Sequence, residues 1–314
     1  MMKDVEKLVM PTPFAVGDVY AYLIKGERLT LVDAGVNTEE AFAALQKQLA
    51  EKGYKFEDIE QVIITHHHPD HVGLLDRFGE DVPIIGHRKN GPWIAQDEVF
   101  LQKYEQWARQ LFVQFGVDER FFSLLKRFQR SFQYSCRRSL TETVQEGDVV
   151  LGEWRVLETP GHAQSHIVLY RERDGVMIGG DLLLAHISSN PLLEPPLFDE
   201  TERPKALVQY RQSLQRLLDY DISVLLPGHG SNVTNVHELV RTRLKKQEVR
   251  LRMVKEMLSK PITVYELCQK LFSDVYETQL MLTLSQTIGY LDVLEERDEI
   301  VVERAQLPWM YTAK

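Results

Sequence analysis

Four of the ten histidines in this 314-residue chain lie in one heptapeptide, residues 65–71, which reads THHHPDH. Because alternate side chains of an extended backbone point the same way, His66 and His68 can face one metal ion. The proline that follows requires a turn at which a helix can start, and this turn can direct Asp70 and His71 toward a second ion. Imidazole nitrogens and carboxylate oxygens are ligands for zinc and related divalent ions. The heptapeptide therefore indicates metal chemistry.

Three more candidate ligands follow apolar runs elsewhere in the chain: His162 in TPGH, Asp181 in GGD and His229 in PGH. Each lies on a loop after a predicted strand, and strand ends gather at one edge of an α/β sheet, where sites form. A single histidine in such a position is more often structural than a ligand. The recurrence of histidine and aspartate at several strand ends makes a metal site the better interpretation, with His67 pointing away from it.

The elements that would position these residues alternate between strands and helices. Predicted strands cover residues 21–26, 29–35, 61–67, 148–162, 165–172, 175–181 and 222–230. A helix over residues 37–53 has Asn37 or Thr38 as its N-cap and Gly53 at its end. This order of strands and helices predicts an α/β layered fold.

Residues 92–136 differ from this pattern, because they have helical periodicity and many aromatic side chains, among them Tyr104 and Trp107. The simplest explanation is helices packed on a core. The alternative is a helical lid whose aromatic side chains line an apolar pocket over an active site, and the two are compatible.

The C-terminal residues have the element order of a winged helix-turn-helix. A long helix is predicted from Val236 to Ser259, and two helices and an extended pair follow it. The predicted recognition helix, Glu277–Glu296, contains no lysine or arginine and therefore does not suit a phosphate-lined groove. A basic run, RTRLKKQEVRLR at residues 241–252, precedes it, and a solvated helix face explains that run most simply. We interpret this segment as a packing or dimerisation module.

Composition bears on the partners and the location of the protein. The formal net charge is −9, which argues against a nucleic-acid partner, although the winged helix keeps that alternative open. Cys136 and Cys268 form no CxxC pattern and are expected to be free thiols in a reducing compartment. The first residues lack the basic start and apolar run of a signal peptide, and no run approaches the roughly 18 apolar residues of a membrane span. We expect a cytoplasmic protein with no membrane partner.

Together these motifs resemble the metallo-β-lactamase fold superfamily. THHHPDH resembles the HxHxDH signature of that family, and LVDAG around Asp33, TPGH, GGD and PGH resemble its other motifs in order and approximate spacing, over roughly residues 10–235. The resemblance implies a four-layer αββα sandwich with a two-metal site at one edge. It also implies that Asp33 is a buried structural carboxylate near the site.

The resemblance also assigns the ligands. It implies two divalent ions per chain, most simply Zn²⁺, with Mn²⁺ or iron as alternatives. The first ion would be held by His66, His68 and His162, the second by Asp70, His71 and His229, and Asp181 would bridge them. A hydroxide shared by the two metals would attack a carbonyl or phosphorus centre, with Asp70 as the catalytic residue that orients it or carries a proton.

The histidines outside this set are expected to be structural or to lie on the surface; they are His87, His166, His186 and His237. Among them, His186 follows Asp181 by five residues and is the candidate for contact with substrate.

Several branches of the family fit the chain poorly. The commonest zinc β-lactamases have cysteine where Asp181 stands, and the flavin-linked di-iron branch has glutamate where His68 stands. Lactonases of acyl-homoserine lactones carry a tyrosine shortly after the bridging aspartate, which DLLLAHISSNPLL lacks. The sulfur dioxygenase branch shares HxHxDH, so the motif does not exclude it. The C-terminal residues differ from the glutathione-binding region of glyoxalase II and resemble the winged-helix tail of the subgroup that includes β-lactamase-like protein 2, whose relatives include thioesterase-like enzymes and an RNA endonuclease.

The sequence therefore predicts a catalytic domain over residues 1–235, with a lid insertion at about 92–136, and a linking helix plus winged-helix-like domain over 236–314. We expect a metal-dependent hydrolase of a small-molecule ester, thioester or lactone with an apolar part, and a homodimer is one assembly that the C-terminal module would allow. The alternative is a metal-dependent RNA endonuclease or phosphodiesterase, supported by the winged helix and the basic run. A non-catalytic metal-binding protein is a third and weaker interpretation.

Overall fold

Two β-sheets form the centre of the protein in this computed structural model, which describes residues 4–314 except the side chains of residues 126–129. The first sheet has the order β1-β2-β3-β4-β5-β6; its strands are β1 (Val5–Met10), β2 (Val19–Ile24), β3 (Thr30–Val32), β4 (Gln61–Ile64), β5 (Ile84–His87) and β6 (Glu142–Val144). The second has the order β11-β10-β9-β8-β7; its strands are β7 (Val149–Val150), β8 (Trp154–Glu158), β9 (Ile167–Arg171), β10 (Val176–Gly180) and β11 (Val224–Pro227). Strands β3 to β6 are parallel, as are β10 and β11, and the other neighbours are antiparallel.

The alternation of side chains along the strands gives each sheet two apolar faces. In β2, Tyr22 and Ile24 pack in the core between the sheets, whereas Leu23 packs in a separate core on the outer face. In β9, Leu169 faces the inter-sheet core and Val168 the opposite side. Since both faces of both sheets are apolar, each sheet needs a covering layer on its outside.

Helices supply these covering layers. Helix α1 (Glu39–Glu51) packs Leu45 on the outer face of the first sheet, and Thr38 is its N-cap, because the Thr38 side chain accepts a hydrogen bond from the backbone N–H of Ala41 at 3.2 Å. Helices α6 (Ala206–Arg216) and α7 (Val236–Met257) share the core on the outer face of the second sheet. The predicted four-layer αββα fold is confirmed. The sequence interpretation missed α6, although residues 206–216 have helical periodicity.

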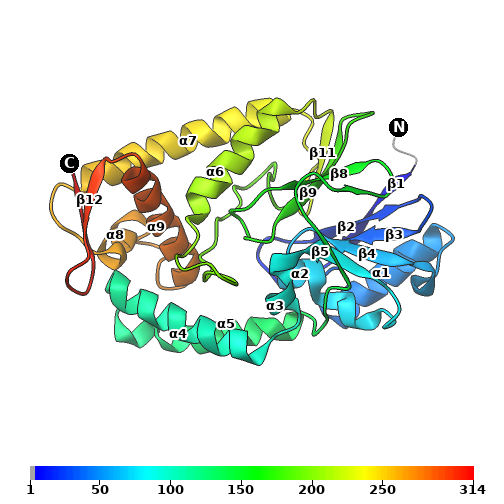
Figure 1. Ribbon diagram of the computed structural model, residues 1–314, viewed down its shortest axis with the longest axis horizontal. Helices are drawn as coiled ribbons and strands as arrows, with labels where there is room; N and C mark the ends of the chain where they lie inside the picture. Colours follow the sequence, from blue (N-terminus) through cyan, green and yellow to red (C-terminus); the bar gives the residue numbers. More distant parts are fainter. Residues whose placement is uncertain (1–3) are drawn as a thin grey trace.

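Further helical segments follow strands β4 and β5 of the first sheet and lead to the site. These are α2 (Pro69–Val72), α3 (Gly91–Ile94), α4 (Glu98–Phe115) and α5 (Ser123–Ser131), with short 3₁₀ helices at Phe56–Asp58, Gly73–Arg77, Arg88–Asn90, Glu119–Phe121, Phe132–Tyr134 and Leu217–Asp219. Figure 1 shows α4 running from the neighbourhood of α3 toward the C-terminal helices. At its far end, the backbone N–H of Trp309 donates to the carbonyl of Gln114 at 2.9 Å. The helical insertion therefore spans the distance between the sheets and the C-terminal residues.

The C-terminal residues form two helices and a hairpin: α8 (Val264–Leu271), α9 (Leu280–Glu296), β12 (Ile300–Glu303) and β13 (Met310–Ala313). One continuous hydrophobic core extends from the second sheet through α6 and α7 to α8 and α9. Twelve residues of α9 are buried, so this helix is covered by its neighbours. In residues 4–314, the structure contains no helix that combines the length and apolarity needed to cross a lipid bilayer.

Candidate metal centre

The seven predicted ligands come together on loops at the ends of four strands. His66 and His68 follow β4, and α2, which begins at Pro69, carries the next two; the other three follow β8, β10 and β11, and the complete set is His66, His68, Asp70, His71, His162, Asp181 and His229. Because β8, β10 and β11 run in the same direction, their C-terminal ends lie at the same edge of the second sheet. The two sheets thus bring residues that are more than 160 positions apart into one site, since it contains both His66 and His229.

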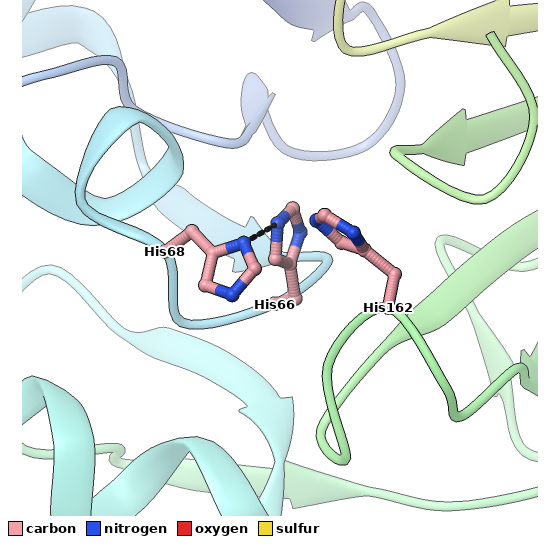
Figure 2. Close-up of side chains that lie close together, drawn as sticks. All are labelled: His66, His68 and His162. Carbon is pink, nitrogen blue, oxygen red and sulfur yellow. Dashed lines mark hydrogen bonds between the residues drawn. The ribbon is translucent and has the colours of Figure 1, made fainter. Parts of the chain in front are cut away.

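Potential ligand atoms of these residues cluster in three overlapping groups. One group contains His66, His68 and His162, and Figure 2 shows these three rings converging from two loops. The second contains Asp70, His71 and His229, and the third joins His66 and His71 to Asp181; within each group the ligand atoms lie within 4.8 Å of one another. His66 Nε2 and His68 Nδ1 are 3.0 Å apart.

The carboxylate of Asp181 lies between the first two groups. Its Oδ1 is 3.6 Å from His71 Nε2, and its Oδ2 is 3.6 Å from His162 Nε2 and 3.5 Å from His229 Nε2. His229 Nε2 is also 3.2 Å from Asp70 Oδ2. A Cβ at Gly228 would lie 2.3 Å from Asp181 Oδ1, so only glycine allows the chain to pass this carboxylate. This explains the glycine of the PGH motif.

Hydrogen bonds on the far side of the rings fix the orientation of three histidines. The Nδ1–H of His71 donates to Asp33 Oδ2 at 2.8 Å, that of His162 to the carbonyl of Asn190 at 2.8 Å, and that of His229 to the carbonyl of Asp18 at 2.7 Å. Since carboxylates and carbonyls only accept, Nδ1 carries the proton in each ring and the Nε2 lone pair faces the centre. Metal-ligating histidines in proteins are held in this way.

Buried polar atoms without partners show that these residues fit a cation. Nε2 of His71, Nε2 of His162 and Oδ1 of Asp181 are buried and accept or donate no hydrogen bond in the described residues. A buried polar atom without a partner is costly, and three of them that point at one another need a shared partner. A set of imidazole nitrogens and carboxylate oxygens accepts divalent transition metals. The histidine and aspartate groups are therefore able to hold metal ions.

Without a metal, the electrostatics of the centre divide the histidines into two kinds. Burial lowers the pKa of His66 and of His68 well below the ordinary value, and neighbouring histidines lower both further. Burial acts to lower the pKa of His71 and of His229, but the carboxylate of Asp181 and its neighbours outweigh it and raise both. Burial alone would raise the pKa of Asp181, but His71 and His229 outweigh it and hold the pKa below its ordinary value. Neutral imidazole and ionised carboxylate are the forms that bind a metal.

Asp33 holds the base of the site together, as a buried structural carboxylate. It accepts hydrogen bonds from the backbone N–H of Thr65 at 2.7 Å and from the Thr65 hydroxyl at 2.8 Å, as well as the bond from His71. The hydroxyl oxygen of Thr65 lies 3.0 Å from His66 Nδ1, so one carboxylate orients two histidines. Asp33 itself has a φ of 62°, a strained conformation for a residue with a side chain.

Replacing Asp33 with asparagine is expected to weaken metal binding by about 10- to 100-fold, the usual effect of removing an outer partner of a ligating histidine. The amide keeps the shape but places an NH₂ group opposite groups that need an acceptor. A chelator competition titration measures the affinity, and Asp219→Asn, at an exposed aspartate, is the control. Unchanged affinity in a folded Asp33→Asn protein would contradict this role.

The histidines outside the ligand set make hydrogen bonds within the fold, apart from His186. His166 is buried behind His66, and its Nε2 accepts the backbone N–H of Asp181 at 3.1 Å, so that nitrogen is not available to a metal. His87 accepts from the backbone N–H of Lys89, and His237 donates to the carbonyl of Tyr220. His186 is exposed and lies against Gly230, the residue after His229. Its contact with substrate stays a prediction.

His67 points to the other side of the loop from the metal groups. Its ring stacks on Trp93, with centroids 4.6 Å apart and planes 5° apart, and its Nδ1 lies 2.8 Å from the hydroxyl of Ser165. Its Nε2 is 4.0 Å from the buried carboxylate of Glu194. Burial raises the pKa of Glu194 to about 8.

The loop at residues 188–194 is a part of the site that the sequence interpretation missed. The Ser189 hydroxyl donates to the carbonyl of Asp181, and Asn190 orients His162. Helix α9 supports the loop, because Gln286 donates to the Asn190 side chain at 2.7 Å and the backbone N–H of Leu193 donates to Ser285 Oγ at 3.1 Å. Nothing in SSNPLLEPPLFDE distinguishes these residues, since backbone carbonyls leave no trace in a sequence.

Comparisons with known proteins agree on one family. The family model described as the metallo-beta-lactamase superfamily matches residues 15–229. The probable metallo-hydrolase YqjP of Bacillus subtilis (strain 168) is 48% identical over 301 residues, which are 95% of this chain and 94% of that protein. The beta-lactamase-like protein 2 homolog of Caenorhabditis elegans is 24% identical and covers 84% of this chain and 74% of its own. The crystal structure of the metallo-beta-lactamase family protein TTHA1429 from Thermus thermophilus has a TM-score of 0.81 at 27% identity and covers 99% of both chains.

Proposed function

The chain belongs to the metallo-beta-lactamase superfamily as a metallo-hydrolase, and from this premise we propose that it hydrolyses a small-molecule ester, thioester or lactone with an apolar acyl part. The observation that carries the proposal is the convergence of buried histidine Nε2 atoms and carboxylate oxygens, held from behind, on two neighbouring groups.

The proposed ligands of the first ion are His66, His68 and His162, and those of the second are Asp70, His71 and His229, with Asp181 shared. When bound, a pair of divalent ions activates a water molecule near neutral pH and polarises the acceptor oxygen of the substrate. We propose Zn²⁺, because its preferences match this donor set; Mn²⁺ and iron are the alternatives that metal analysis would distinguish.

Asp70 is the proposed proton carrier. Its Oδ2 faces His229 Nε2, which leaves Oδ1 to accept a proton from the attacking water. The same carboxyl group then returns the proton to the leaving alcohol or thiol, so that water and ester give acid and alcohol. His186, exposed beside Gly230, is proposed to contact the leaving part of the substrate.

Helix α9 supports an acyl substrate over a nucleic acid. It occupies the place of the recognition helix in the winged-helix order, yet it has no lysine or arginine and its residues are mostly buried. A helix that reads a nucleic-acid groove must be exposed and must neutralise phosphates. We propose instead that residues 236–314 form a winged-helix-like packing module, as the resemblance to β-lactamase-like protein 2 suggests, beside a catalytic domain at 1–235 with its lid at 92–136.

A groove along α7 supports phosphodiester cleavage as the second candidate function. Arg243, Lys246 and Arg250 line a cavity of about 540 Å³ that also contacts Ser189 and Asn190, directly behind two proposed metal ligands. Basic side chains so close to a metal centre would suit an RNA backbone. Against this, Arg243 is engaged with the carbonyls of residues 184, 185 and 187.

We propose a cytoplasmic location, consistent with the buried free thiols Cys136 and Cys268, and a homodimer as the alternative to a monomer. Analytical ultracentrifugation measures the oligomeric state.

A substrate panel tests the function. Metal-loaded protein is assayed with acyl thioesters, aryl esters, lactones, a phosphodiester and a structured RNA, with Asp70→Ala as the blank and Asp199→Ala, at an exposed aspartate, as the matched control. Acyl substrates should be cleaved at least about 100-fold faster by the parent than by the blank, the lower range for a proton carrier. Cleavage of RNA, with steep salt dependence and no acyl turnover, would overturn the proposal in favour of the second candidate.

A further inference from the structure

A cavity of about 300 Å³ lies beside the loop at residues 65–71, and His67, His68 and Pro69 of that loop line it. Three further parts of the chain line it: the helical insertion, the loop at 188–194 and the start of α9. Its apolar lining includes Trp93, Phe132, Leu192, Leu193, Met281 and Leu282. His67, His68 and Glu194 form the wall toward the metal centre.

We propose that this cavity, called the acyl pocket from here on, binds the uncharged apolar acyl group of the substrate, and that α9 determines the length of group that it accepts. The inference rests on the proposed acyl hydrolase function, and it adds the binding site, the chemical class of the group bound and the residues that select it.

The position of His68 connects the acyl pocket to the reaction. This ring belongs to the group with His66 and His162 and also lines the acyl pocket. When the carbonyl group of a substrate lies at the metal groups, only the His68 side chain therefore separates its acyl carbon atoms from the pocket. The volume is at the small end of ligand sites, which suits one acyl group and not a polymer segment.

The charges of the lining residues select an uncharged group. Among the described side chains that line the pocket there is no lysine or arginine, and the carboxyl group of Glu194 is buried with a backbone N–H, that of Gln164, as its hydrogen-bond donor. A phosphate or carboxylate entering the pocket would lose its water and gain no counter-ion from these side chains. An alkyl or aryl group gains free energy from the same transfer.

The walls of the acyl pocket are held in place before a ligand arrives. Trp93 is fixed by the stacked ring of His67 and by edge contact with Phe100, at a centroid distance of 4.7 Å. On the opposite wall, Ser285 accepts the backbone N–H of Leu193 and donates to the carbonyl of Met281 at 2.9 Å. A preformed apolar site avoids the cost of ordering its walls on binding.

Met281 is the residue that should limit the acyl length. It extends from the first turn of α9 into the pocket, and an unbranched methionine adapts to differently shaped neighbours. Residue 281 is not itself a proposed ligand, so a larger, stiffer side chain there would fill the pocket without removing a metal-binding group. The C-terminal part of the chain, far from the signature motifs in sequence, would thus set specificity.

The experiment measures kcat/KM for p-nitrophenyl esters from acetyl to decanoyl. In the parent protein, kcat/KM should rise by about fourfold per methylene until the pocket is full, the increment for burying a CH₂ group. Met281→Trp should lower kcat/KM for the longest accepted ester by at least about tenfold and leave the acetyl ester within about threefold. Met281→Leu should keep the parent profile. Val113→Trp, on the exposed face of α4, controls for the new indole group.

Calorimetric titration with 1-octanol, which is uncharged and not hydrolysed, separates this inference from the proposed function. Octanol binding that Met281→Trp abolishes supports the acyl pocket even if no ester is turned over, in which case the proposed function fails alone. Ester turnover whose length profile is the same in parent and Met281→Trp overturns the acyl pocket and leaves the function standing. Binding of adenosine in place of octanol would overturn the acyl assignment.

Discussion

Replacing Asp181 with alanine is expected to lower turnover by at least about a thousandfold and to reduce the bound metal from two ions per chain to one or none. Its two oxygens face three histidine Nε2 atoms at 3.5–3.6 Å, which places this carboxylate between both groups. Removing an outer partner of a ligand typically costs 10- to 100-fold in affinity or activity, and removing a shared direct ligand should cost more.

Mass spectrometry of the metals in purified protein, together with the ester assay, measures this result. Asp199→Ala makes the same chemical change at an exposed carboxylate and should retain both ions and turnover. Circular dichroism and the melting temperature establish that Asp181→Ala is folded. A folded variant with two bound ions and parent turnover would show that Asp181 does not bridge the site.

The composition of the centre could be predicted from sequence because its ligands follow strands in short, distinctive motifs. HxHxDH places donors by backbone geometry alone, since alternate residues face one side and a proline starts the next turn. The role of Asp33 as a buried support was implied only by the family resemblance of LVDAG. The partners of His162 and His229 could not be predicted, because each is a backbone carbonyl from a distant loop, supplied by Asn190 and Asp18.

The fold shows the same division between local and long-range information. Strand and helix signals up to β11 predicted an α/β layered fold, because apolar alternation reports which faces are buried. The four layers came from the family resemblance, and β1, β5, β6 and α6 were not predicted. The C-terminal residues gave the right helix order, but their sequence did not indicate that α9 would brace the loop at 188–194 and line the acyl pocket. Those contacts join positions about 90 residues apart, and no local pattern encodes them.

Breaking the buried ion pair between Arg203 and Asp292 is expected to lower the free energy of unfolding by about 3–5 kcal/mol, the usual cost of leaving one buried charge alone. Arg203 precedes α6 and donates to both carboxylate oxygens of Asp292 in α9, with one of these bonds at 2.7 Å. Asp292 is 2% exposed, so water cannot replace the lost partner. Urea denaturation of Asp292→Asn and Arg203→Met measures the effect; Lys205→Ala, which breaks an exposed pair with Glu296, should cost no more than about 1 kcal/mol.

The double variant Arg203→Met/Asp292→Leu decides what the pair contributes. Apolar replacement of both partners removes the desolvation cost together with the attraction, so stability should return to within about 1 kcal/mol of the parent or exceed it. If the double variant is as unstable as the single ones, the loss comes from packing and the ion-pair explanation is wrong. A stable double variant would also show whether the ion pair positions α9, because any change in activity could then not come from lost stability. Helix α9 carries both Asp292 and Met281, which lines the acyl pocket. A changed ester-length profile in that variant would therefore mean that the ion pair holds α9 in its position beside the site.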